Sequence, residues 1–184
     1  SNLVGNLPLE QAMQAEFDKL GPVPFEKGDE AFAEEIRKTL TTEDIAASFQ
    51  RAGRQTPPEL PLCDFVAPLD RPSHGGEGST DVGDVSWVTP TVQARVATCA
   101  VGTPFHTWQT VAQGKAPAAH KGMVHAAKVM AATATHLINS PETLQAARDV
   151  HDNRQQTTPY VCPIPPNAKP PIINAPSSRS TKRI

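Results

Sequence analysis

The chain has 184 residues, which is enough for one domain or for a domain plus part of another. Its net charge of −2 and its pI of about 6.3 exclude a strong positive field that would attract nucleic acid or an anionic membrane. No apolar run approaches the roughly 18–20 residues that cross a bilayer. Cys63, Cys99 and Cys162 lie far apart and form no CxxC pair, and no signal peptide precedes them, so we expect a reducing, cytoplasmic location.

Three helices are predicted in the first third of the chain, at residues 8–20, 27–40 and 43–51. In the first two, apolar residues recur every three or four positions and form a stripe along one face. Pro8 suits the first turn of the first helix. Thr42 is a suitable N-cap for the third helix, because its hydroxyl can accept a hydrogen bond from a free backbone N–H.

The middle of the chain changes character. Residues 54–76 are rich in proline and show little periodicity, which predicts a long connection of the kind that is often functional. Residues 78–87, GSTDVGDVSW, predict a turn-rich loop. Residues 85–101 are β-prone, and within them residues 92–98 alternate in side-chain character, which predicts a strand. Arg95 on that strand is interpreted as a surface residue, with anion binding as the alternative.

The helix most clearly indicated by the sequence covers residues 116–138. Met123, Ala127, Met130, Ala134 and Leu137 form one stripe on it, and its many alanines allow close packing against a sheet. A last helix follows from residue 141 to about 154. From residue 159 the chain is rich in proline and becomes basic at its end. Helices around a strand-rich middle predict an α/β fold.

Two carboxylates and a histidine are the candidate site. Asp81 and Asp84 are hard oxygen donors that could bind a divalent cation or orient a histidine, and His106 follows in the turn-rich segment 102–108. The alternative for the acidic segment is a capped turn, in which Asp and Ser side chains bond local backbone N–H groups. The residues alone leave both interpretations open.

Four motifs in fixed order carry a resemblance to a known family. Together they resemble the aminobenzoyl-glutamate hydrolase B subunits, within the di-metal amidohydrolase and carboxypeptidase superfamily that includes aminoacylase and carboxypeptidase G. The likeness runs from about residue 8 to about residue 171, and its motifs are residues 78–91, 102–108, 114–123 and 158–165.

The resemblance implies that this chain is the C-terminal part of a two-domain enzyme. Residues 1–24 would end a ferredoxin-like lid and dimerisation domain. Residues 25–171 would form the C-terminal half of a zinc-peptidase-like catalytic domain, a mixed sheet flanked by helices, and residues 172–184 a basic, proline-rich tail. The family's early metal-ligand His, bridging Asp and catalytic Glu have no match here, so the chain alone is expected to be inactive.

The resemblance also implies roles for individual residues. His106 matches the late histidine of the family, a metal ligand. Asp81 takes the place of an acidic loop residue, with Thr80 where many relatives have Glu, and both would bind substrate or orient a ligand; for Asp81, binding a metal ion is the alternative. Asp84, Lys115 and His120 are further candidates of that kind. No catalytic residue is expected in this portion.

The implied reaction is metal-dependent cleavage of the amide bond of an N-acyl amino acid, most simply p-aminobenzoyl-glutamate to p-aminobenzoate and glutamate. Two divalent ions, zinc or manganese, would polarise the carbonyl and a bridging water. The implied partners are the small substrate, the missing half of the catalytic domain, and other subunits in a homodimer or hetero-oligomer. The alternatives are a dipeptidase or aminoacylase of the same superfamily, and a non-catalytic interaction module derived from it.

Overall fold

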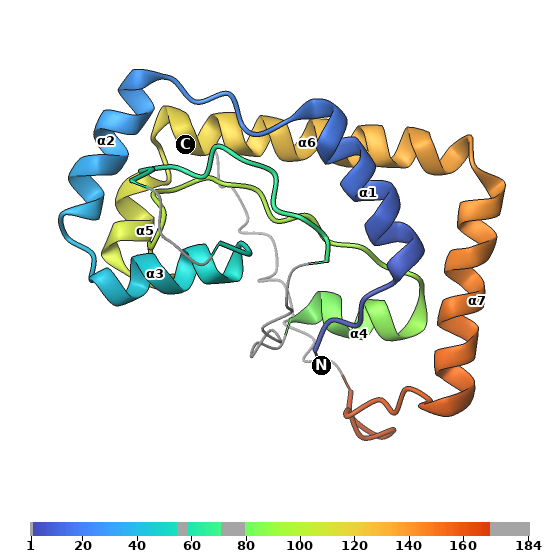
Figure 1. Cartoon of the computed structure of the whole chain (residues 1–184). Coiled ribbons are helices and arrows are strands. Elements are labelled where there is room, and N and C mark those ends of the chain that lie inside the picture. The colour runs from blue at the N-terminus through green and yellow to red at the C-terminus, as the bar shows by residue number, and fades with distance from the viewer. Residues whose placement is uncertain (1, 55–58, 71–79, 170–184) are drawn as a thin grey trace, which may run out of the picture.

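The computed structural model describes residues 2–54, 59–70 and 80–169, and 57% of these residues are helical. The helices lie around a middle region of extended chain (Figure 1). Their bounds are α1 Leu7–Leu20, α2 Lys27–Arg37, α3 Thr42–Arg51, α4 Asp81–Val88, α5 Trp108–Gln113, α6 Pro117–Ile138 and α7 Pro141–Thr157.

The predicted α/β fold with a mixed sheet is wrong for the part of the chain that the structure describes, which contains no strand. The first residues of the β-prone stretch belong to helix α4. Residues 90–101 run as an extended chain, but alternation of side chains produces a strand only where a neighbouring backbone supplies hydrogen bonds. At the end of this stretch, one backbone hydrogen bond links the two extended segments among the described residues, from Val101 N–H to Pro61 O over 2.9 Å.

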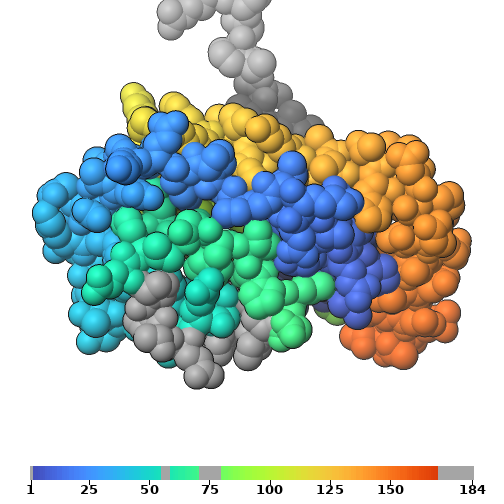
Figure 2. Space-filling model, turned by 45° about the horizontal axis from the view of Figure 1, so that its top comes forward, coloured from blue at the N-terminus to red at the C-terminus, as the bar shows by residue number. Residues whose placement is uncertain are grey.

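Helices α1, α6 and α7 form the best-packed part of the molecule. Helix α1 lies against both of the others, and the three make one continuous surface in the space-filling view (Figure 2). Asn6 caps α1 by accepting a hydrogen bond from Leu9 N–H, and its amide donates to Ala147 O of α7 over 2.8 Å. Glu16 of α1 pairs with His136 of α6 at 2.8 Å. The cap of α1 and the hydrogen-bonded contact between Glu16 and His136 therefore hold the three helices together.

Helix α2 is attached to the start of α6 by charge and by a small core. Lys121 of α6 lies 2.6 Å from Asp29 and 3.1 Å from Glu26. Beside this pair, a cluster of buried apolar side chains joins α2, α6 and the extended chain, and its members are Ala33, Ile36, Leu62, Ala100 and Ala118. The ion pair and the cluster together set the position of α2.

The predicted packing face of α6 is not the one that packs. The buried residues of α6 are Ala118, Gly122, His125, Val129 and Thr133. Met123 and Met130, from the predicted stripe, are each 61% exposed. Both faces of this helix are apolar, so periodicity alone could not tell which one the rest of the chain covers.

Two glycines permit close approach to the extended chain. A side chain at Gly122 of α6 would collide with the carbonyl oxygen of Ala97. Gly102 has a φ of +96°, and a side chain there would meet Ile45 of α3 at 2.7 Å. These contacts fix the extended residues between α3 and α6.

Several other predictions concern boundaries. Helix α2 ends at Arg37 rather than at residue 40, and Thr41, not Thr42, caps α3. The predicted domain limits at residues 24 and 171 stay predictions, and the tail 172–184 lies outside the described residues. No described helix is both long enough and apolar enough to cross a bilayer.

Candidate functional site

The acidic segment that was predicted as a loop forms the short helix α4. Thr80 is its N-cap, and the hydroxyl of Thr80 accepts a hydrogen bond from Val82 N–H. Asp81 begins the helix and is exposed. The first two residues of the motif, Gly78 and Ser79, lie outside the described residues. An acidic first turn complements the positive end of a helix dipole, so the local sequence explains this helix well.

Asp84 has a hydrogen-bonded partner far along the chain. The hydroxyl of Tyr160 donates to an Asp84 carboxylate oxygen over 2.9 Å, and this bond raises the pKa of Tyr160 to about 12. The ring of Tyr160 also stacks on Trp87, with 6.3 Å between ring centroids. Asp84 therefore helps to hold the chain that follows α7 against α4.

His106 occupies an unusual backbone conformation. Its φ of +64° makes it the sole residue other than glycine with a positive φ in the described part of the chain. Its side chain is exposed and makes no hydrogen bond with another described residue. Non-glycine residues in this region cost of order 1 kcal/mol and persist where surrounding contacts hold them, often at functional sites.

A network of hydrogen bonds holds the turn that carries His106. The buried amide of Gln113 accepts from Ala100 N–H over 2.7 Å and donates to the Thr103 hydroxyl over 3.0 Å. The hydroxyls of Thr107 and Thr110 both donate to Pro104 O. Sequence analysis missed Gln113, because a single glutamine on a short helix carries no spacing signal.

The predicted candidates in the segment 114–123 are exposed, while a neighbour carries the contacts. Lys115 and His120 lie on the surface. Lys121 instead pairs with Asp29, and its hydrogen bond to that carboxylate raises the pKa of Lys121. Burial by itself raises the pKa of Asp29, but the bonds from Lys121 and from Glu26 N–H outweigh it and lower that pKa overall. Lys121 is thus a structural cation that the sequence analysis overlooked.

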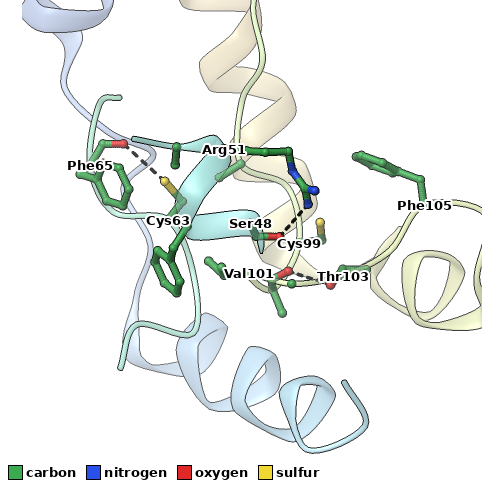
Figure 3. A pocket seen from close by; sticks show the side chains of 13 residues that line it. Ser48, Arg51, Cys63, Phe65, Cys99, Val101, Thr103 and Phe105 are labelled. Atoms are coloured by element: carbon green, nitrogen blue, oxygen red, sulfur yellow. Dashed lines mark hydrogen bonds between the residues drawn. The ribbon is translucent and has the colours of Figure 1, made fainter. Parts of the chain in front are cut away.

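A cavity of about 200 Å³ lies beside the His106 turn, between α3 and residues 97–105 (Figure 3). Phe105 lines it, as does Arg51, whose guanidinium donates to the Ser48 hydroxyl over 3.1 Å. Cys63 and Cys99 line it as free thiols, and burial raises the pKa of both, so they remain protonated and poorly nucleophilic at neutral pH. A guanidinium is suited to binding a carboxylate.

The two halves of the predicted site are not adjacent. Helix α4, with Asp81 and Asp84, and helix α5, which follows His106, lie well apart in Figure 1. Within the described residues no three His, Cys, Asp or Glu side chains are grouped as they would be around a metal ion. A metal site that includes His106 would therefore need donors from outside the described part of this chain.

Comparison with known proteins finds similarity to a subunit of a hydrolase. The chain is 40% identical over 180 residues to the B subunit of p-aminobenzoyl-glutamate hydrolase from Escherichia coli (strain K12). The alignment covers 92% of this chain but 37% of the relative, so this chain spans little more than a third of the relative's length. The resemblance inferred from the motifs is thereby confirmed.

Two further comparisons give no match. No family model matches the chain. No solved structure matches it either.

Proposed function

We propose that this chain is part of a metal-dependent amidohydrolase that cleaves p-aminobenzoyl-glutamate, or a closely similar N-acyl amino acid, at its amide bond. The observation that carries the proposal is the 40% identity to a hydrolase subunit over nearly the whole chain. The general base and the remaining metal ligands belong to polypeptide beyond this chain. We further propose a cytoplasmic enzyme that assembles as a homodimer or hetero-oligomer.

In this proposal His106 supplies one metal ligand. An exposed imidazole with no hydrogen-bonded partner among the described residues fits that role, because the ring can approach a cation with either nitrogen. Bound divalent ions, zinc or manganese, would lower the pKa of a water and polarise the amide carbonyl. The rigid turn built by Gln113 and Pro104 would hold the imidazole in place, which reduces the cost of ordering it on metal binding.

The other candidates act around this ligand. Asp81 and Thr80 would contact substrate or orient a ligand from the start of α4. Lys115 and His120, both exposed, would contribute cationic or hydrogen-bonding groups toward the substrate's carboxylates. Asp84 would act more indirectly, because its carboxylate already accepts the Tyr160 hydroxyl.

The test separates the imidazole of His106 from its backbone conformation. In the complete hydrolase, His106→Ala should lose metal and lower kcat by about 100-fold or more, as loss of a metal ligand removes the main source of charge stabilisation. His106→Gly accepts a positive φ without strain but has no imidazole, so it should be equally impaired. Lys128→Ala, at an exposed position of α6 away from the turn, is the control.

Metal content by elemental analysis and release of p-aminobenzoate are the two measurements. Recovery of activity in His106→Gly would mean that residue 106 matters through its backbone, and the ligand assignment would be wrong. Turnover of N-acetyl amino acids or dipeptides in place of p-aminobenzoyl-glutamate would reassign the substrate within the same reaction class.

A further inference from the structure

Helix α6 is apolar on two sides, and the described residues of this chain cover one of them. The covered side carries Gly122, His125 and Val129, which are all buried. The other side carries an exposed apolar surface, which we call the outer face of α6. An apolar face of a helix is normally buried against another element. The members of the outer face are Met123, Val124, Ala127, Met130, Ala131, Ala134 and Ile138.

The outer face carries large apolar side chains and no charged side chain. Met123 and Met130 are each 61% exposed, Val124 is 50% exposed and Ile138 is 77% exposed. His120 lies at its N-terminal end and is the one titratable residue on it within α6. At 100° per residue, Lys121, Lys128 and Thr135 line the adjoining polar flank, about 80–120° around the helix from Ala127 at the centre of the outer face. Helix α6 runs along the upper edge of the molecule in both Figure 1 and Figure 2.

The size of the outer face argues against a second copy of this chain as its occupant. From Met123 to Ile138 the helix rises about 24 Å, and a face about 10 Å wide then offers about 240 Å². Two copies packed through this face would bury about 500 Å² in total, whereas a stable interface buries about 1,200–2,000 Å². Such a face serves better as one contact among many inside a larger folded subunit.

We propose that the outer face of α6 is the docking surface for the part of the hydrolase subunit that corresponds to the remaining length of the relative. The relative contains polypeptide for which this chain has no counterpart, since the alignment covers 37% of it. The occupant would present an uncharged, apolar surface that packs against the two methionines. This inference rests on the proposed membership of a hydrolase subunit, but it concerns assembly and requires neither metal nor substrate.

The experiment uses two variants that place the same charge on different sides of α6. Met130→Lys puts an ammonium group on the outer face, and Thr135→Lys puts one on the polar side; both positions are exposed, so the chain itself should stay folded by circular dichroism. The binding probe is the polypeptide of the Escherichia coli relative that lies outside the aligned region, tagged and co-expressed with this chain. Binding is measured without metal or substrate, so its outcome is separate from that of the activity assay.

We expect a complex with the native chain and with Thr135→Lys, and at least a 30-fold loss of affinity with Met130→Lys, because a buried ammonium group without a partner is costly. Native binding should also reduce the fluorescence of an apolar dye on this chain, and Met130→Lys should not. Equal binding by both variants, or no complex with any of them, would overturn the proposal. If the chain alone formed a concentration-dependent oligomer that Met130→Lys dissociates, a second copy would be the occupant and the proposal would be wrong. Binding of this face to a different subunit of the hydrolase would also overturn it.

Discussion

Two regions of this chain meet their hydrogen-bonding needs in opposite ways. The helical frame, α1, α2, α6 and α7, satisfies its backbone groups within each helix and joins its members through capped ends and ion pairs. The extended middle, residues 59–70 and 89–107, lies against this frame without forming a ladder among the described residues. The backbone N–H and C=O groups of an extended chain need hydrogen-bond partners from a neighbouring segment, whereas those of a helix bond to each other within the helix.

The difference explains which parts of the structure depend on sequence far away. The frame needs contacts between helices that the chain itself provides, such as Asn6 with Ala147. The extended middle is fixed by close approach to the frame, as at Gly122, and by side chains such as Gln113. Predictions that weaken one region while sparing the other can therefore test the comparison.

The largest expected effect is within the frame, at the ion pair between α6 and α2. Lys121→Met leaves the buried carboxylate of Asp29 without its cation. The free energy of unfolding should fall substantially, because the buried carboxylate of Asp29 loses its cation. Urea unfolding followed by circular dichroism measures it. Lys115→Met, at an exposed position without an ion pair among the described residues, should change stability by less than about 0.5 kcal/mol; equal effects of the two would contradict the assignment.

The pH dependence of stability should also report the ion pair between Lys121 and Asp29. The pKa of Asp29 lies below its ordinary value of 3.8, so the stability that its carboxylate contributes is complete above about pH 4 and is lost as pH falls through the lowered pKa. The stability gap between the native chain and Lys121→Met should therefore stay constant from about pH 5 to 8 and narrow below about pH 4. A gap that stays the same down to about pH 2.5 would show that Asp29 is not the partner.

A smaller effect is expected where the frame meets the extended middle. Gly122→Ala adds a methyl group that collides with Ala97 O and comes within 2.8 Å of the Thr98 methyl group, and it should lower the free energy of unfolding by about 2 kcal/mol. Gly28→Ala in α2 is the matched control, because nothing lies within 4 Å of the added methyl. That change should stabilise by about 0.5 kcal/mol through the entropy of the unfolded chain. Thermal unfolding of both variants gives the comparison.

The smallest effect concerns the contact between α4 and the chain after α7. Tyr160→Phe removes one hydrogen bond to Asp84 and should lower the free energy of unfolding only slightly, as measured by urea unfolding. Tyr160 is the one tyrosine in the sequence, so the ultraviolet absorbance of tyrosinate reports it alone. Its titration midpoint should lie near 12 and move toward the ordinary value of 10.0 in Asp84→Asn. A native midpoint near 10 would remove Asp84 from this role.

The sequence predicted α1, α2, α3, α6 and α7 well because their signals are local, but it missed the short helices α4 and α5. Pro8 and Pro141 lie in the first turns of α1 and α7, and Leu9 and Met13 of the apolar stripe of α1 are buried, although Leu20 at its end is exposed. The prediction from sequence was wrong where the same residues fitted two structures equally well. Both faces of α6 are apolar, and the acidic segment 81–88 suited a capped helix as well as a loop. The resemblance, carried by four motifs in order, is confirmed, while the site roles of His106 and Asp81 stay predictions.

The sequence by itself determined five of the helices, α1, α2, α3, α6 and α7, to within a few residues, and which hydrolase family this chain resembles, because caps, prolines and ordered motifs act within a few residues of one another. The tertiary structure alone decided that α6 turns Val129 inward and Met130 outward, that Lys121 rather than Lys115 forms the ion pair, and that Gln113 holds the turn before α5. These outcomes depend on which segments lie side by side in space. Burial and pairing are properties of neighbours, and the residues near a position in the chain do not specify its neighbours in the fold.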